Sequence, residues 1–168
     1  MVPPITIGGS GCLLTCLAMI APGGGVTPGQ LDTILSGPGY EFIDDNGNLD
    51  VEGVVKDYFG FVSYFVYNQD LLSEIDINET IIDYMKSGFI MIAHVESRTG
   101  SAAGHFILIT GQGLDELGFC HILVADPAGS SYPVLDQYVL NDLRIMYPGA
   151  AITTPTITPT PVPTGFTD

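Results

Sequence analysis

Apolar residues recur at helical spacing in the first half of the chain and at strand spacing in the second half. The spacing predicts helices over residues 12–21, 27–36, 49–59 and 78–87. Short apolar runs predict strands over residues 62–67, 89–95, 105–110, 119–125 and 143–147. Helices followed by sequential strands are typical of an α+β fold with an antiparallel sheet. We therefore expect an α+β domain whose first half is mainly helical.

Proline and glycine mark the ends of these elements and set off the C-terminal segment. Pro22 and the glycines at 23–25 end the first helix, and Thr27-Pro28 has the form of a helix cap followed by proline at the first helical position. Residues 150–168 are rich in Thr and Pro and predict an extended tail whose hydroxyls suit O-linked glycans. We expect one domain over residues 1–149 and a tail over 150–168.

The charge of the chain excludes several classes of partner. Four Lys and Arg residues stand against nineteen Asp and Glu residues, which gives a formal net charge of −15. Such a surface repels nucleic acid and anionic lipid, so we expect neither as a partner, and the apolar runs are too short for membrane insertion. Three cysteines cannot all pair, so no disulfide framework is expected. The acidic, lysine-poor composition favours an extracellular location or a cell or virion surface.

Cys12 is the first candidate for chemistry. It follows the Gly-rich stretch 8–11 and opens the first predicted apolar helix, where free backbone N–H groups and the helix dipole favour a thiolate. Cys16 lies one turn further along the same helix, where we expect it to be buried and inert. A cysteine in an apolar helix is more often packing than nucleophile, so Cys12 needs a base nearby.

The predicted hairpin of the second half supplies that base. If the turn of the hairpin is centred on residues 115 and 116, His105 lies directly opposite Asp126 on one face of the sheet. A register shift of one residue would break this pairing. A histidine held by a carboxylate is the base and its orienting acid in a Cys-His-Asp triad. The alternative is a half-buried histidine whose charge Asp126 balances without any catalytic role.

In this combination the chain resembles the papain-like cysteine peptidases, and within them the branch similar to the bacteriocin-leader-processing, or double-glycine, peptidases. The resemblance spans residues 5–148 and rests on Thr6-Ile7-Gly8, Gly11-Cys12-Leu13-Leu14-Thr15, Leu17-Ala18-Met19, Gly47-Asn48-Leu49, Gly104-His105-Phe106 and Ala125-Asp126-Pro127. It implies a papain-like fold in which the nucleophile helix packs on an antiparallel sheet formed by the second half.

The resemblance also implies the roles of the site residues. Cys12 would be the nucleophile, His105 the base and Asp126 the orienting acid, acting on a peptide or protein substrate through an acyl-enzyme. The family carries a glutamine upstream of the cysteine that helps to bind the oxyanion. Here the first glutamine is Gln30, inside a predicted helix, and the backbone N–H of Cys12 is the donor we expect to remain. Loss of one such donor typically costs on the order of 100- to 1000-fold in turnover.

The sequence therefore supports two hypotheses about function. The first is a cysteine peptidase with no cofactor and no metal, since Cys120 and His121 are adjacent in a strand and point to opposite faces. The second is a weakened or inactive subunit of an extracellular filament or surface assembly. In that hypothesis the tail over residues 150–168 contacts a neighbouring copy of the chain.

Overall fold

The computed structural model describes residues 7–44, 48–68, 77–97, 104–129 and 134–149. The Thr/Pro tail over residues 150–168, and every prediction made for it, lies outside this described part of the chain. The described residues form an α+β fold, as the sequence predicts. Within them no helix is both long and apolar enough to span a membrane.

The helices follow the predicted order with two changes: the first helix starts earlier than predicted, and the third is replaced by two short helices. Helix α1 spans Ile7–Ile20, α2 spans Pro28–Leu35 and α4 spans Ile77–Lys86. Thr27 caps α2, because its hydroxyl accepts from the Gln30 amide while the Gln30 side chain accepts from the Thr27 amide. The single helix predicted over 49–59 is instead the short α3, Val51–Gly53, followed by the π-helix η1, Val54–Tyr58.

Five antiparallel strands form one sheet in the order β1-β5-β2-β3-β4. Their bounds are Ser63–Asn68 (β1), Ile90–Ser97 (β2), His105–Leu114 (β3), Cys120–Ala125 (β4) and Tyr138–Tyr147 (β5), with the 3-10 helix η3, Leu135–Gln137, just before β5. The strand predicted over 143–147 therefore starts five residues earlier. One edge of the sheet is β1, from the first half of the chain, so the sheet does not come from the second half alone.

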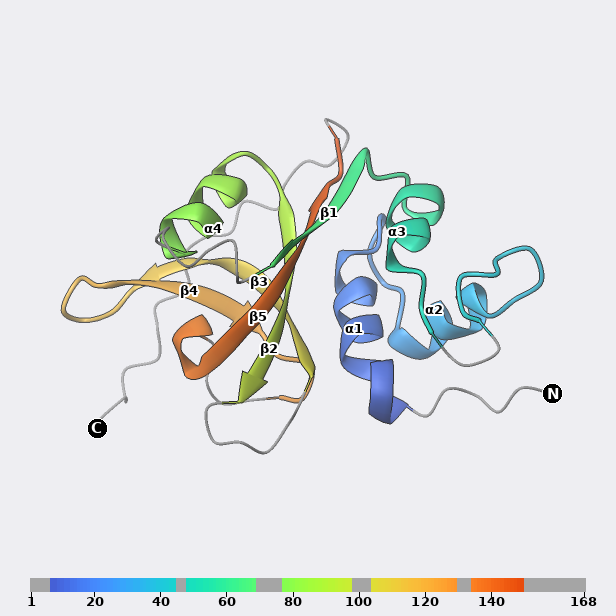
Figure 1. The fold of residues 1–168 in the computed structure, drawn as a ribbon, viewed down its shortest axis with the longest axis horizontal. Coiled ribbons are helices and arrows are strands. Elements are labelled where there is room, and N and C mark those ends of the chain that lie inside the picture. The colour runs from blue at the N-terminus through green and yellow to red at the C-terminus, as the bar shows by residue number, and fades with distance from the viewer. Residues whose placement is uncertain (1–6, 45–47, 69–76, 98–103, 130–133, 150–168) are drawn as a thin grey trace.

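Both faces of the sheet are covered, and neighbouring residues of a strand serve different cores. In β2, Ile92 packs with α1 and α2, whereas Met91 packs on the other side with Ile81 of α4. Successive side chains of a strand point to opposite faces, which explains this division. Helices α1, α2 and α3 accordingly lie on one side of the sheet and α4 on the other (Figure 1).

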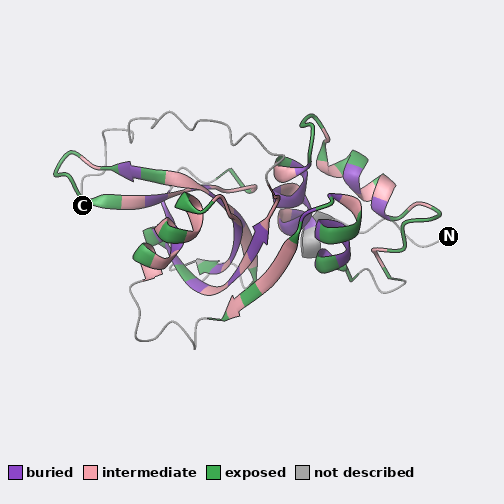
Figure 2. Cartoon of the chain, turned by 90° about the horizontal axis from the view of Figure 1, so that it is seen from above, coloured by how far each residue is buried: buried purple, intermediate pink, exposed green. Residues whose placement is uncertain are grey.

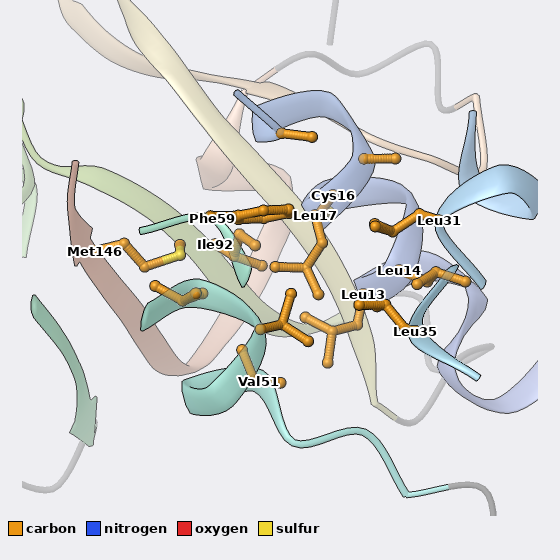
Figure 3. Close-up of a cluster of buried hydrophobic side chains, with 14 of the residues drawn as sticks. Leu13, Leu14, Cys16, Leu17, Leu31, Leu35, Val51, Phe59, Ile92 and Met146 are labelled. Carbon is orange, nitrogen blue, oxygen red and sulfur yellow. The ribbon is translucent and has the colours of Figure 1, made fainter. Parts of the chain in front are cut away.

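Helix α1 is the centre of the larger core. It lies between the sheet and the other helices of its side, and most of its residues from Leu13 to Ala18 are buried (Figure 2). Leu17 of α1 is fully buried and lies among side chains from α1, α2, α3, β2 and β5 (Figure 3). The helix that carries Cys12 is therefore held on several sides, which fixes the position of the thiol relative to the sheet.

A substitution at Gly53, at the end of α3, would test how tightly this region is packed. A methyl group at this position would lie 2.5 Å from an Asp50 carboxylate oxygen and 2.8 Å from the Phe42 ring. Asp50 caps α3 by accepting from the Gly53 amide, so the added carbon would also disturb that cap. We expect Gly53→Ala to lower the free energy of unfolding by roughly 1–3 kcal/mol, measured by urea denaturation.

The matched control for this variant is Gly29→Ala in α2. Apart from its chain neighbours and the backbone of its own helix, nothing lies within 4 Å of the added methyl group there, and alanine favours the helix. We expect this variant to be neutral or to stabilise the protein by up to about 1 kcal/mol. Equal effects of the two substitutions would contradict the packing described around Gly53.

Candidate functional site

The side chains of Cys12 and His105 meet between helix α1 and the start of strand β3. Cys12 Sγ lies 3.1 Å from His105 Nδ1. One turn further along α1, the Cys16 thiol donates to the backbone carbonyl of Phe106, at an S···O distance of 3.6 Å. Helix α1 is thus tied, through the Cys16 side chain, to the residue next to His105. This contact aligns the helix with the strand and holds the thiol beside the imidazole.

The second nitrogen of His105 faces Asp126. His105 Nε2 lies 2.6 Å from Asp126 Oδ1, and the two side chains are only 12% and 6% exposed. A carboxylate can only accept hydrogen bonds, so Nε2 must carry the proton of the neutral ring. Nδ1 is then the unprotonated nitrogen, and it is the one that faces the thiol. This tautomer leaves His105 able to take the Cys12 proton.

Asp126 is itself fixed by two further hydrogen bonds. The Ala128 amide donates to Oδ1 at 2.8 Å, and the Tyr138 hydroxyl donates to Oδ2 at 2.7 Å. Burial alone would raise the pKa of the Asp126 carboxyl, but the hydrogen bonds from Tyr138, from the Ala128 amide and from His105 outweigh it and hold that pKa below its ordinary value. The carboxyl therefore stays ionised at neutral pH.

Asp126 and His105 meet by a different route from the one the sequence predicts. The predicted register, with the two residues directly opposed, is wrong: the hairpin turn is centred on Leu117, and β3 has a bulge between Ile109 and Gly111. His105 pairs with Val95 of β2 instead.

The contact forms because the chain turns immediately after β4. In this turn the Gly129 amide donates to the Asp126 carbonyl, and the Ala128 amide donates to the Asp126 side chain. The turn directs the carboxylate back toward the start of β3. The three predicted site residues are therefore brought together, although the predicted pairing is absent.

Cys12 does not open its helix, contrary to prediction. Helix α1 begins at Ile7, so the Gly-rich stretch is helical and Cys12 is its sixth residue. The Thr15 hydroxyl donates to the Gly11 carbonyl at 2.7 Å inside this helix. The cost of glycine in a helix is about 1 kcal/mol per residue, which the packing of an apolar helix can offset.

This longer helix changes two expectations about the site. A helix leaves only its first four N–H groups unpaired, so the Cys12 N–H falls beyond them and is not the free oxyanion donor we expect from sequence. The dipole effect also weakens beyond the first turn, so the activation of Cys12 depends on its contact with His105, which can accept the thiol proton. Gln30 caps α2 and is thereby engaged elsewhere.

The other two cysteines differ sharply in their surroundings. Cys16 is fully buried, as the sequence predicts. Burial, followed by the nearby Cys12 and Asp126, raises the pKa of its thiol to about 12, so it remains protonated. Cys120 is exposed at the start of β4. It offers an accessible thiol in the same chain against which the reactivity of Cys12 can be compared.

A second polar cluster lies beside the site on the sheet. His94 Nδ1 is 2.8 Å from Asp142 Oδ2, and the His94 ring stacks on Phe106 with ring centres 4.6 Å apart. The guanidinium of Arg144 lies over the same Phe106 ring at 4.7 Å. These contacts fix the residue next to His105 and give His94 a structural role. No group of three or more His, Cys, Asp or Glu side chains in the described ranges could hold a metal ion.

His121 connects the hairpin to the segment before β5. Its Nε2 lies 3.1 Å from Asp115 and its Nδ1 lies 2.7 Å from Asp136. The hydrogen bond to Asp115, followed by that to Asp136, raises the pKa of His121 above its ordinary value. The charged imidazole is therefore favoured in the folded state.

This arrangement predicts a specific dependence of stability on pH. The contribution of His121 should be fully present below pH 6.5, the pKa of an unperturbed histidine, and lost as pH rises through the raised pKa of the folded state. Because His121 is near the surface, we expect its contribution to the free energy of unfolding to be less than about 1 kcal/mol. Urea unfolding at pH 6 and pH 9 should show a smaller difference for His121→Gln than for the wild type, and an unchanged difference would contradict the double ion pair.

We compared the chain with family models, with curated proteins and with solved structures, and none matches it.

Proposed function

We propose that this chain is a papain-like cysteine peptidase domain that hydrolyses peptide bonds through Cys12, His105 and Asp126. One observation carries the proposal: His105 has its two ring nitrogens 3.1 Å from a thiol and 2.6 Å from a carboxylate. Nucleophile, base and orienting acid within hydrogen-bond reach of one another form the arrangement that activates a thiol for acyl transfer.

The reaction would proceed in two stages. Cys12 Sγ gives its proton to His105 Nδ1 and attacks the carbonyl carbon of a peptide, forming a tetrahedral adduct. His105 then returns the proton to the leaving amine as the C–N bond breaks, which leaves a thioester on Cys12. In the second stage a water molecule loses a proton to His105 and attacks the thioester, which releases the acid and restores the thiol.

Asp126 supports both stages without reacting. Its Oδ1 accepts from His105 Nε2, so the ring keeps Nδ1 toward the thiol, and its negative charge stabilises the imidazolium that forms during each stage. The ring is mostly buried, and this limits exchange of the transferred proton with solvent. These features account for the base and its orientation from residues of this chain alone.

The test is the rate of alkylation of Cys12 by iodoacetamide between pH 5 and pH 8. The exposed Cys120 serves as the internal reference, and peptide mapping by mass spectrometry assigns the modified residue. We expect Cys12 to react faster than Cys120 below pH 7, where an ordinary cysteine is almost wholly protonated. A Cys12 rate no higher than that of Cys120 over this range would contradict the proposal.

The second candidate is a subunit that keeps this fold in an extracellular or surface assembly with weak activity or none. The observation in its favour is the position of Cys12 inside α1, which removes the expected backbone oxyanion donor. In this candidate the Thr/Pro tail contacts a neighbouring copy. Sedimentation of the full chain and of a variant lacking residues 150–168 tests it, and unchanged assembly on deletion would exclude it.

A further inference from the structure

Tyr138 contacts the candidate site from strand β5, which is separated from β3 by β2 in the sheet. It is the first residue of β5, and its ring is buried in the core that contains Ile81 of α4. Its hydroxyl reaches out of this apolar environment and donates to Asp126 Oδ2 at 2.7 Å. A tyrosine whose ring is fixed by packing can hold its hydroxyl in one place at little further entropic cost.

The hydroxyl of Tyr138 completes the surroundings of the Asp126 carboxylate. Oδ1 accepts from His105 and from the Ala128 amide, so Oδ2 has Tyr138 as its side-chain donor. With donors on both oxygens, the carboxylate cannot rotate freely about its bond to the Cβ atom. Hydrogen bonds to the ionised form also oppose its protonation, which its burial would otherwise favour.

The segment that leads to Tyr138 is tied to β4, the strand that leads to Asp126. Val134 forms a β-bridge with Leu123 of β4, and Asp136 accepts from His121 of the same strand. Two independent contacts thus fix the chain within four residues before Tyr138. The distance between the tyrosine hydroxyl and the carboxylate is therefore set by the fold rather than by a single hydrogen bond.

We propose that Tyr138 is a positioning residue of the site, which holds the Asp126 carboxylate directed at His105 Nε2 so that Nδ1 stays toward Cys12. This inference rests on the proposed function, and it adds a fourth member to the set of residues on which the reaction depends. Its described contact with the site is the hydrogen bond to Asp126, so its proposed role is exerted through that carboxylate.

The experiment uses Tyr138→Phe in the full chain, which keeps the packed ring and removes the hydroxyl. We expect the alkylation rate of Cys12 at pH 7 to fall about 10-fold, the loss that corresponds to one hydrogen bond to a charged group. The ratio of the wild-type alkylation rate to that of the variant should grow as pH falls toward 4.5. The reason is that Asp126 without this donor protonates at a higher pH. Tyr147→Phe, at the other end of β5, is the matched control and should react like the wild type.

A double-mutant cycle separates positioning from packing. In an Asp126→Asn background, Tyr138→Phe should cause no further loss of Cys12 reactivity, because the carboxylate that it supports is gone. An equal loss in both backgrounds, or a pH profile that keeps its shape, would overturn the proposal and leave Tyr138 as part of the core.

A measurement on the carboxyl group distinguishes failure of this inference from failure of the proposed function. The ¹³C signal of the Asp126 carboxyl should titrate below the ordinary value of about 3.9 in the wild type, and at a higher pH in Tyr138→Phe. This readout does not depend on any reactivity of Cys12. A signal that titrates identically in the two proteins would overturn the role of Tyr138, whereas a slow Cys12 in the wild type would overturn the peptidase proposal.

Discussion

Replacing Cys12 with alanine is expected to lower peptide cleavage by on the order of 10⁴-fold or more. The substitution removes the sulfur that attacks the peptide carbonyl, and the remaining His105–Asp126 pair cannot form a thioester. The wild type would first be incubated with a peptide mixture, and the cleaved bonds would be identified by mass spectrometry. The initial rate on the fastest peptide then gives the loss for the variant.

Cys120→Ser is the control for this measurement. Cys120 is exposed and lies on β4, and its replacement should leave the rate of cleavage within about 2-fold of the wild type. Circular dichroism of both variants establishes that the fold is retained. Cleavage that survives in Cys12→Ala would remove Cys12 from the mechanism, and cleavage that is lost in Cys120→Ser would show that the loss is not specific to Cys12.

The α+β arrangement and most of its elements follow from the sequence because their signals are local. The Thr27-Pro28 cap appears in the structure with both hydrogen bonds of a capping box. The predicted runs over 89–95 and 119–125 correspond to β2 and β4 with shifts of one or two residues at their ends. Spacing, caps and glycines act within a few residues, so a single sequence carries them.

The route by which the site assembles could not be predicted in the same way. The residues His105 and Asp126 were identified from sequence, but their predicted pairing depends on counting residues across a turn. One bulge in β3 and a turn centred on Leu117 change that count, and neither has an unambiguous local signal. The contact survives because the turn after β4 directs Asp126 toward His105.

Tyr138 shows a second limit of sequence reasoning. It lies 12 residues from Asp126 in the chain, in a strand whose predicted start was Leu143. Its hydroxyl reaches Asp126 only because η3, which precedes Tyr138, is held against β4 by the contact between Asp136 and His121. A long-range contact of this kind has no period and no motif, so only the three-dimensional structure reveals it.

Helix α1 is the element on which both the fold and the site depend. Its buried side carries Leu17 in the core, and the turn before it carries Cys12. A loss of packing under Leu17 should therefore weaken the fold, and it should also loosen the contact between the thiol and His105.

We expect Leu17→Ala to lower the free energy of unfolding by roughly 2–5 kcal/mol, because Leu17 is fully buried and its loss leaves a cavity between α1, α2 and the sheet. Urea denaturation followed by circular dichroism measures this. Met19→Ala, two residues away on the same helix, is the control: Met19 is 48% exposed, and we expect a cost below about 1 kcal/mol.

Cys16 provides an independent probe of the same prediction. It is fully buried on α1, and its thiol donates to the Phe106 carbonyl, so alkylation of Cys16 requires α1 to separate from the sheet. Its alkylation rate in native buffer should rise in Leu17→Ala by a factor that matches the lost stability, and it should stay near the wild-type rate in Met19→Ala. Similar free energies of unfolding for the two variants, or a Cys16 that is equally protected in both, would show that α1 is not the centre of the core and that the position of Cys12 is fixed by other contacts.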